Sequence, residues 1–217
     1  MGAQAFKIIE QLSKHITDDI VEVGSDRGEG STQFLKSFSD QNKNNFYSID
    51  FDKDVYNNAT TIINDNAYHM TGEDFLENEY VKFNSKISFA YLDNFDYIFP
   101  EIEGRDFVHD QVSSYKTKGY EMNNDNSKLA HLQQSQLIHK YSAKECFILF
   151  DDTYIEHTGE YSGKGGTAIP WLLKNGWYIM NEDKGAHKRK YERYHNYGEW
   201  KDSLKDYWFI LRKMPNE

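Results

Sequence analysis

Apolar residues along the chain fall into two kinds of run, short continuous runs and longer runs with helical spacing. Continuous runs such as Lys86–Leu92 and Cys146–Phe150 predict strands that are covered on both faces. Runs such as Ser31–Phe38, whose apolar residues fall on one side, predict amphipathic helices. We expect strands at 19–23, 45–50, 67–70, 86–92, 146–150, 177–180 and 207–212, and helices at 6–15, 31–38, 55–64, 72–76, 127–141 and 168–174.

The alternation of strands and helices predicts an α/β fold with a Rossmann-like doubly wound sheet of about seven strands, mostly parallel. No clear helical pattern separates the last two strands, so we expect them to form an antiparallel pair at the sheet edge. The length suits a single domain over residues 1–217. The interval between Leu92 and Cys146 is about twice what a helical crossover needs. We therefore expect an insertion at about residues 100–126, either a lid that shapes a substrate pocket or a disordered excursion.

Charge and composition restrict the partners. The chain has 35 acidic and 25 basic residues, a net charge of −10, which argues against nucleic acid as the main partner. The first residues lack the apolar core of a signal peptide, and no stretch is long enough to span a membrane. We expect a cytoplasmic protein that acts on a small molecule, without membrane association. The oligomeric state stays open.

Ligands of a doubly wound sheet bind at the carboxyl ends of its strands, and the first of these ends is rich in glycine. The run Gly24-Ser-Asp-Arg-Gly28-Glu-Gly30-Ser31 allows a sharp turn, and the following helix N-terminus favours a carboxylate. Its spacing differs from the dinucleotide pattern Gly-x-Gly-x-x-Gly. An ordinary tight turn is the alternative interpretation.

The next two strand ends carry acidic residues. Asp50 follows Gly24 by 26 positions, where a carboxylate can accept hydrogen bonds from a ribose in either S-adenosylmethionine (SAM) or NAD. The run Thr71-Gly72-Glu73-Asp74 could meet an adenine ring, or it could simply cap a helix.

Three aspartates follow the fourth and fifth strands. Asp93 ends one strand, and Asp151 and Asp152 end the next. Carboxylates brought together without a cation repel one another, and a hard cation such as Mg²⁺ would relieve this repulsion. Such a cation could bind a substrate hydroxyl and lower its pKa. The alternative is that these aspartates cap the following helices.

Taken in order, these segments resemble the motifs of class I SAM-dependent methyltransferases. Residues 21–32 resemble motif I and Tyr47–Asp50 resembles motif II. Tyr91–Asn94 and Leu149–Asp152 resemble the metal-binding strand ends of catechol O-methyltransferase-like and macrocin-type sugar O-methyltransferases. The resemblance implies SAM as cofactor and a divalent cation, with Mg²⁺ the expected ion, on Asp93, Asp151 and Asp152. The residues that we expect at the cofactor are Glu22, Gly24, Arg27, Gly28, Ser31, Asp50, Phe51, Gly72, Glu73, Asp74 and Asp93.

The general base departs from the family pattern. Catechol-type enzymes have a lysine three residues after the first metal aspartate, and this chain has Asp96 there. A carboxylate can accept the proton, although its basicity is low unless burial raises its pKa. His131 and His139, on the helix before the fifth strand, are the alternatives. Our candidate catalytic residues are Asp96 and His139, and the choice of base stays open.

The most specific prediction is metal-assisted O-methylation of a small polar acceptor such as a sugar, a nucleoside or a catechol-like compound. The insertion supports a hydroxyl-rich acceptor, because it contains polar and aromatic residues: His109, Gln111, Tyr115, Tyr120, Asn123, Asn124 and Asn126. Ser162-Gly-Lys164-Gly-Gly166 lacks the order of a P-loop, and we interpret it as a flexible loop beside the site. The alternatives are a non-catalytic or metal-independent SAM-binding domain and an NAD-dependent oxidoreductase, which the glycine spacing disfavours.

Overall fold

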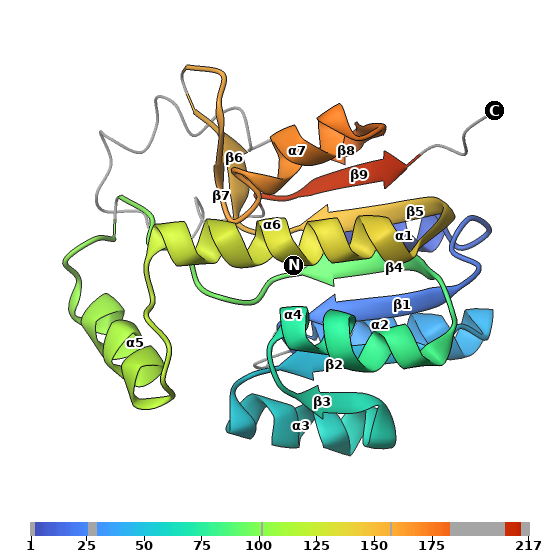
Figure 1. Cartoon of the computed structure of the whole chain (residues 1–217), viewed down its shortest axis with the longest axis horizontal. Helices are drawn as coiled ribbons and strands as arrows, with labels where there is room; N and C mark the ends of the chain where they lie inside the picture. The colour runs from blue at the N-terminus through green and yellow to red at the C-terminus, as the bar shows by residue number, and fades with distance from the viewer. Residues whose placement is uncertain (1–2, 26–29, 101, 157, 183–206, 214–217) are drawn as a thin grey trace.

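A seven-stranded sheet forms the centre of the computed structural model, which describes residues 3–25, 30–100, 102–156, 158–182 and 207–213 (Figure 1). The strand order is β3-β2-β1-β4-β5-β9-β8. Strands β1 to β5 are parallel, whereas β9 pairs antiparallel with both β5 and β8. The predicted doubly wound sheet with an antiparallel C-terminal pair is confirmed. The strands are β1 Asp19–Val23, β2 Phe46–Asp50, β3 Ala67–His69, β4 Ile87–Leu92, β5 Ser142–Phe150, β8 Trp177–Glu182 and β9 Phe209–Lys213.

Helices cover both faces of this sheet (Figure 1). One face is packed by α1 Ala3–Gln11, α2 Ser31–Asn42 and α3 Lys53–Ile63. The other face is packed by α6 Asn124–Tyr141, α7 Ala168–Lys174 and the turns that follow α4 Gly72–Asp74. Those turns are a π turn, Phe75–Glu79, and a 3₁₀ turn, Tyr80–Phe83, and a further 3₁₀ turn, Asn64–Asn66, follows α3.

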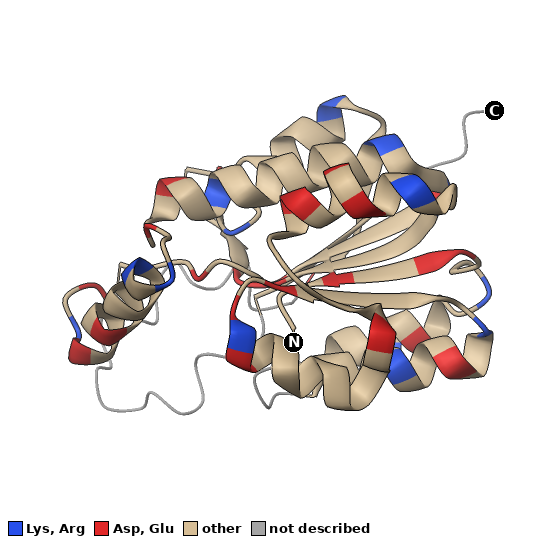
Figure 2. Cartoon of the chain, turned by 60° about the horizontal axis from the view of Figure 1, so that its bottom comes forward, with Lys and Arg blue, Asp and Glu red and all other residues tan. Residues whose placement is uncertain are grey.

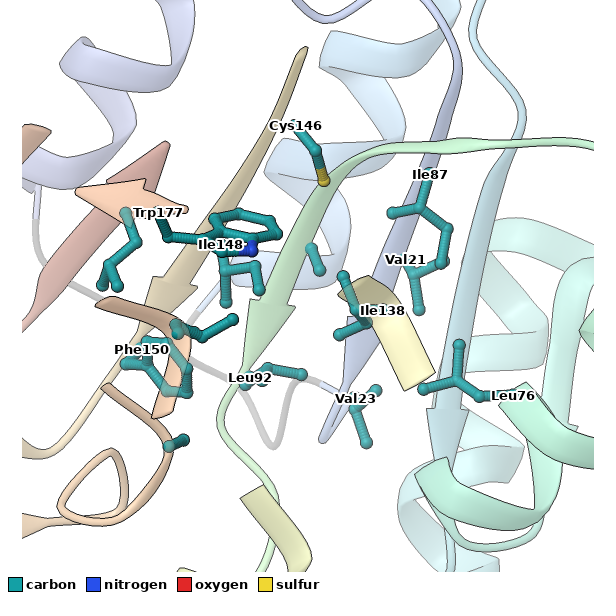
Figure 3. Close-up of a cluster of buried hydrophobic side chains, with 14 of the residues drawn as sticks. Val21, Val23, Leu76, Ile87, Leu92, Ile138, Cys146, Ile148, Phe150 and Trp177 are labelled. Carbon is teal, nitrogen blue, oxygen red and sulfur yellow. The ribbon is translucent and has the colours of Figure 1, made fainter. Parts of the chain in front are cut away.

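The continuous apolar runs are explained by burial on both faces. Every residue of β4 is buried, with Phe89 and Tyr91 on the α1 side and Ile87 and Leu92 on the α6 side. Figure 3 shows the α6 side, where Ile138 packs over the middle strands. Charged positions lie mostly on helices and loops, and the strands are largely uncharged (Figure 2). No helix in the described ranges combines the length and the apolar character needed to cross a bilayer.

The predicted insertion is ordered around a helix. Asp106–Thr117 forms α5, which lies beyond the carboxyl ends of the central strands (Figure 1). Helix α6 begins at Asn124, three residues before the predicted start at Ser127. A small antiparallel hairpin, β6 Thr153–Ile155 and β7 Tyr161–Gly163, stands between β5 and α7 and was not predicted. Both additions lie at the strand ends where a ligand is expected.

Candidate active site

The glycine turn after β1 is held by a buried carboxylate. Glu22 is fully buried, and its carboxylate accepts hydrogen bonds from the hydroxyls of Ser31 (2.7 Å), Thr32 (2.7 Å) and Ser48 (2.6 Å). Glu22 and Ser31 were expected at the cofactor, and the structure uses their side chains to join the turn to α2. Arg27 and Gly28 were also expected there, and they lie outside the described residues.

Gly24 brings the first and fourth strand ends into backbone contact. Its φ is +94°, and a Cβ at this position would lie 2.5 Å from the backbone nitrogen of Asn94. Only glycine tolerates both the conformation and the approach. Gly30, also with positive φ, is the N-cap of α2 and has no side-chain capping bond.

Asp50 and Phe51, at the end of β2, were both expected at the cofactor. The Asp50 carboxylate accepts hydrogen bonds from the backbone nitrogens of Ser25 (3.0 Å) and Asp52 (2.7 Å), and its side chain is buried. The Asp50 carboxylate therefore connects the loop after β1 to the loop after β2. Phe51 packs on Tyr120 of the insertion, with ring centroids 4.6 Å apart.

The third strand end combines a helix cap with a buried amide. Thr71 caps α4 by accepting from the backbone nitrogen of Asp74, so the capping interpretation of this run is confirmed. Glu73 accepts from the Gln134 amide at 3.2 Å, and burial raises the pKa of Glu73. A Cβ on Gly72 would lie 3.1 Å from that amide nitrogen. Gly72 and Glu73 thus contact helix α6, a neighbour that the sequence did not indicate.

Three buried acceptor atoms at these strand ends have no hydrogen-bond partner within the described part of the chain. They are Oδ1 of Asn94, Oε1 of Gln134 and Nε2 of His131. His131 donates through Nδ1 to the Ser127 carbonyl at 2.7 Å, which assigns the other ring nitrogen as an acceptor. Buried acceptors without donors are rare in folded proteins, so these atoms indicate a place for a ligand that donates hydrogen bonds.

The structure brings Asp93, Asp151 and Asp152 together, as the strand register requires, because Leu92 pairs with Phe150. The buried Tyr91 hydroxyl lies 2.8 Å from carboxylate oxygens of both Asp93 and Asp151. Burial, and then the charges of Asp93 and Asp152, raise the pKa of Asp151 to about 6. Since Tyr91 has one hydroxyl hydrogen, a proton on Asp151 that points to the Tyr91 oxygen would satisfy both contacts.

A lysine that the prediction had assigned to a flexible loop lies among these aspartates. The Lys164 ammonium donates to Asp93 Oδ1 at 2.5 Å, and its nitrogen lies 3.1 Å from Asp152 Oδ2. The Lys164 side chain is 2% exposed. Burial alone disfavours its charged form, but Asp93, Asp152 and Asp96 raise the pKa of Lys164 well above the usual value.

This arrangement does not fit the predicted divalent cation. No cluster of three or more histidine, cysteine or acidic side chains among the described residues has the geometry of a metal site. Asp93 Oδ1 and Asp152 Oδ2 face the Lys164 ammonium, and the remaining oxygen of Asp93 faces Tyr91. The aspartates converge as expected, and the positive charge that they need comes from a side chain.

The candidate bases separate in space. His139 lies in the last turn of α6, at the amino end of β5, and its Nδ1 accepts from the Trp177 indole at 2.9 Å. His139 therefore lies near the amino ends of the strands, whereas the aspartates lie at their carboxyl ends. The prediction that placed His139 in the site is corrected. Asp96 does lie near the aspartates, where its carboxylate accepts from the Tyr115 hydroxyl at 3.2 Å. His131, two turns earlier on α6, is close enough to Lys164 for that charge, after burial, to help lower the pKa of His131 to about 4.

The polar residues of the insertion mostly attach it to the domain. Asn124 exchanges two hydrogen bonds with the backbone of Ile98, and Asn123 caps α6. Lys118 of the insertion pairs with Asp52 at 2.5 Å. Asn123 and Asn124 had been expected to shape a substrate pocket, and in the structure they fix the start of α6. Lys118, for which no role was predicted, fixes the end of α5 beside the residues that follow β2.

Gln134 is a site residue that the sequence did not indicate, and Lys164 and Tyr91 lie in segments that were expected near the site but were given no role in it. Lys164 had a detectable signal, because a lysine flanked by glycines in Gly163-Lys164-Gly165 can be carried close to another backbone. Gln134 had none, since its helix has polar residues at every turn.

Comparison with known proteins supports the fold. No protein-family model matches the chain, and no curated protein is similar to it in sequence. Two solved structures superimpose over 99% of the chain with a TM-score of 0.54 and 10% sequence identity. One, a candidate rRNA methylase from Clostridium thermocellum, is covered over 99% of its length, and the other, a candidate methyltransferase from Streptococcus mutans in complex with S-adenosylhomocysteine (SAH), over 100%. At this identity the likeness establishes a shared Rossmann-like fold.

Proposed function

We propose that this protein is a SAM-dependent methyltransferase that methylates a hydroxyl group of a small polar acceptor. The observation that carries the proposal is a pair of buried acceptors that have no partner among the described residues: Asn94 Oδ1, just after β4, and Gln134 Oε1, on α6 beside the end of β3. They lie next to Gly24 and Gly72, which keep the backbone free of side chains there. SAM carries hydrogen-bond donors at both ends, an ammonium group and an adenine amine, so its donors complement these atoms.

The residues present fit this cofactor in its several parts. The N-terminus of α2, which begins after Gly30, suits the carboxylate of the methionine part. Asn94 would accept from its ammonium, and Gln134 with Glu73 would accept from the adenine amine. Phe51, packed against Tyr120 and Tyr115, offers an aromatic face to the ring. The SAH bound to the Streptococcus mutans neighbour, which has this fold, supports the choice of ligand.

Bound SAM supplies an electrophilic methyl group, and the protein has to orient an acceptor oxygen and take up its proton. Carboxylates at the fourth and fifth strand ends can do both. The side chain of Asp152 is 40% exposed, so it can accept a hydrogen bond from an incoming hydroxyl. Asp96 stays our candidate base, since Tyr115 holds its carboxylate beside the aspartates. Such a polar, acidic surface suits a sugar or nucleoside.

A second acceptor class follows from the Clostridium thermocellum neighbour, whose name refers to rRNA. The net charge of −10 opposes a nucleic-acid backbone, so the small acceptor is our first choice. Incubation with radiolabelled SAM and either ribosomal RNA or a panel of sugars and nucleosides separates the two. If the radiolabel is transferred to RNA, and the transfer decreases as salt is added, then rRNA and not a small molecule is the acceptor.

Calorimetric titration with SAH, and with NAD as the competing cofactor, tests the proposal. We expect SAH to bind and NAD not to bind. Gln134→Leu should weaken SAH binding about tenfold, because one hydrogen-bond acceptor is lost. Gln133→Leu is the matched control, since Gln133 is the exposed neighbour on the same helix. Equal binding by both variants, or binding of NAD alone, would contradict the proposed cofactor.

A further inference from the structure

Two glycines carry Lys164 into the aspartate cluster. Gly163 has a φ of +80°, and a Cβ there would lie 2.0 Å from the carbonyl oxygen of Asp152. The backbone nitrogen of Lys164 donates to that same carbonyl at 3.1 Å, and Gly165 donates to the Thr153 hydroxyl at 2.9 Å. The loop is therefore attached to the end of β5, and it fixes the base of the lysine side chain.

The ammonium group of Lys164 is surrounded by oxygen. Its nitrogen lies 2.5 Å from Asp93 Oδ1, 3.2 Å from the Asp93 carbonyl and 3.1 Å from Asp152 Oδ2. An ammonium has three N–H donors, and this is the number of oxygens around it. The set of a backbone carbonyl and two carboxylates is also the kind of ligand set that Mg²⁺ and Mn²⁺ prefer.

A divalent cation and this ammonium compete for the same oxygens. A metal ion would have to displace the lysine or accept a positive charge within a few ångströms, which is unfavourable in a buried site. The lysine cannot easily withdraw, because its side chain is buried and the backbone nitrogens of Lys164 and Gly165 are hydrogen-bonded to Asp152 and Thr153. Tyr91 occupies further oxygens of Asp93 and Asp151.

We propose that Lys164 is a built-in substitute for a divalent cation: its ammonium holds Asp93 and Asp152 in place, and the site binds no metal. Lys164 is then a positioning residue, which fixes the carboxylate and the carbonyl of Asp93 at the end of β4. The role of Lys164 does not depend on the proposed function. Only one consequence rests on it, namely that methyl transfer by this protein requires no added metal.

An ordinary buried salt bridge is the competing interpretation, and it makes a different prediction. A salt bridge that only stabilises the fold would leave no metal affinity when the lysine is removed. A lysine that fills a cation position leaves a vacant ligand set, so its removal should create a site for a divalent ion.

Titration of the protein with Mn²⁺, followed by electron paramagnetic resonance of the free ion, tests this difference. The wild type should bind no Mn²⁺ more tightly than about 1 mM, the weak limit of protein sites for hard cations. Lys164→Ala should bind Mn²⁺ at least about tenfold more tightly. Adding Asp152→Asn to Lys164→Ala should abolish the gain. Lys82→Ala is the matched control, because Lys82 also pairs with a carboxylate, Glu79, but on the surface.

Each outcome of these titrations either supports or overturns the proposed role of Lys164. Mn²⁺ binding by the wild type that Asp93→Asn removes would overturn the proposal, and this titration needs no lysine variant to fold. A folded Lys164→Ala protein without gained affinity would also overturn it. If Lys164→Ala does not fold, the wild-type titration and the activity of Lys164→Arg decide. Arginine keeps the charge, so it should retain part of kcat, whereas Lys164→Met should lower kcat with little change in the KM for SAM.

The same experiments separate this inference from the proposed function. The Mn²⁺ titration requires neither SAM nor an acceptor, so a protein that fails to bind SAH can still support the role of Lys164. Conversely, SAH binding with tight wild-type Mn²⁺ binding would retain the methyltransferase and reject the built-in cation. A methyltransferase assay in the presence of a chelator should show unchanged activity.

Discussion

Two neighbouring strand ends bury negative charge in different ways. At the end of β1, Glu22 is buried, and three hydroxyl groups donate to its carboxylate. At the ends of β4 and β5, Asp93, Asp151 and Asp152 lie together, and a buried ammonium lies between two of them. One buried charge can be stabilised by neutral donors, but several like charges at close range need a full positive charge.

The largest change in stability should follow removal of the positive charge of Lys164. Lys164→Met should lower the free energy of unfolding by about 3–5 kcal/mol at neutral pH, since it leaves the half-buried Asp93 and the buried Asp151 close together without a compensating positive charge. Urea denaturation measures this change. Lys82→Met, which breaks the exposed pair with Glu79, should change it by less than about 1 kcal/mol. Similar losses in both variants would remove the distinction between a buried and a surface ion pair.

The next effect concerns the pH dependence of His131, on the α6 side of the same cluster. Its pKa is lowered to about 4, chiefly by burial and then by the charge of Lys164. Between pH 6.5 and 4 the unfolded chain therefore binds the proton and the folded protein does not, so stability is lost as the pH falls. The whole loss is about 3 kcal/mol.

His131→Asn should lack this loss, because the amide can still donate to the Ser127 carbonyl but does not titrate. The difference in unfolding free energy between wild type and variant should thus shrink or change sign from pH 7 to pH 4. The raised pKa of Asp151 has the opposite effect on stability in both proteins, and it cancels in the difference. His109→Asn, at an exposed position on α5, is the control. A pH-independent difference for His131→Asn would show that this histidine titrates normally.

The smallest effect should be at Glu22. Glu22→Gln keeps the shape but replaces one acceptor oxygen by an amide NH2 group, which faces hydroxyl groups that had donated to that oxygen, so we expect a loss of about 1–3 kcal/mol in the free energy of unfolding. Chemical denaturation of Glu22→Gln and of the exposed control Glu77→Gln measures it. A loss as large as that of Lys164→Met would mean that hydroxyl donors and an ammonium stabilise these carboxylates equally, which would contradict the expected difference between the two strand ends.

Much of the framework could be predicted from the sequence because its signals are local. Continuous apolar runs located the central strands, and the aspartates that end β4 and β5 were expected to meet because adjacent parallel strands end at the same edge. The glycine turn was located by its missing side chains. Asp50 was located because it directly follows a predicted strand, although the hydrogen bond from the backbone nitrogen of Ser25 to its carboxylate was not foreseen.

The predictions that were wrong or missing concern residues whose positions depend on contacts between segments distant in the sequence. Lys164 follows Asp152 by twelve residues and returns to it through a hairpin that has no clear periodicity. His139 was misplaced because the composition of a helix does not say which of its ends faces the ligand edge. The insertion residues gave the right composition for a binding loop, yet Asn123 and Asn124 serve caps and backbone contacts.

The most direct test is a crystal structure of the protein grown with SAH and excess Mn²⁺, with anomalous diffraction data collected for manganese. We expect SAH density that contacts Asn94 and Gln134, the Lys164 ammonium between Asp93 and Asp152, and no anomalous peak between these two aspartates. A manganese peak between these aspartates with Lys164 displaced, or SAH bound elsewhere, would contradict this expectation.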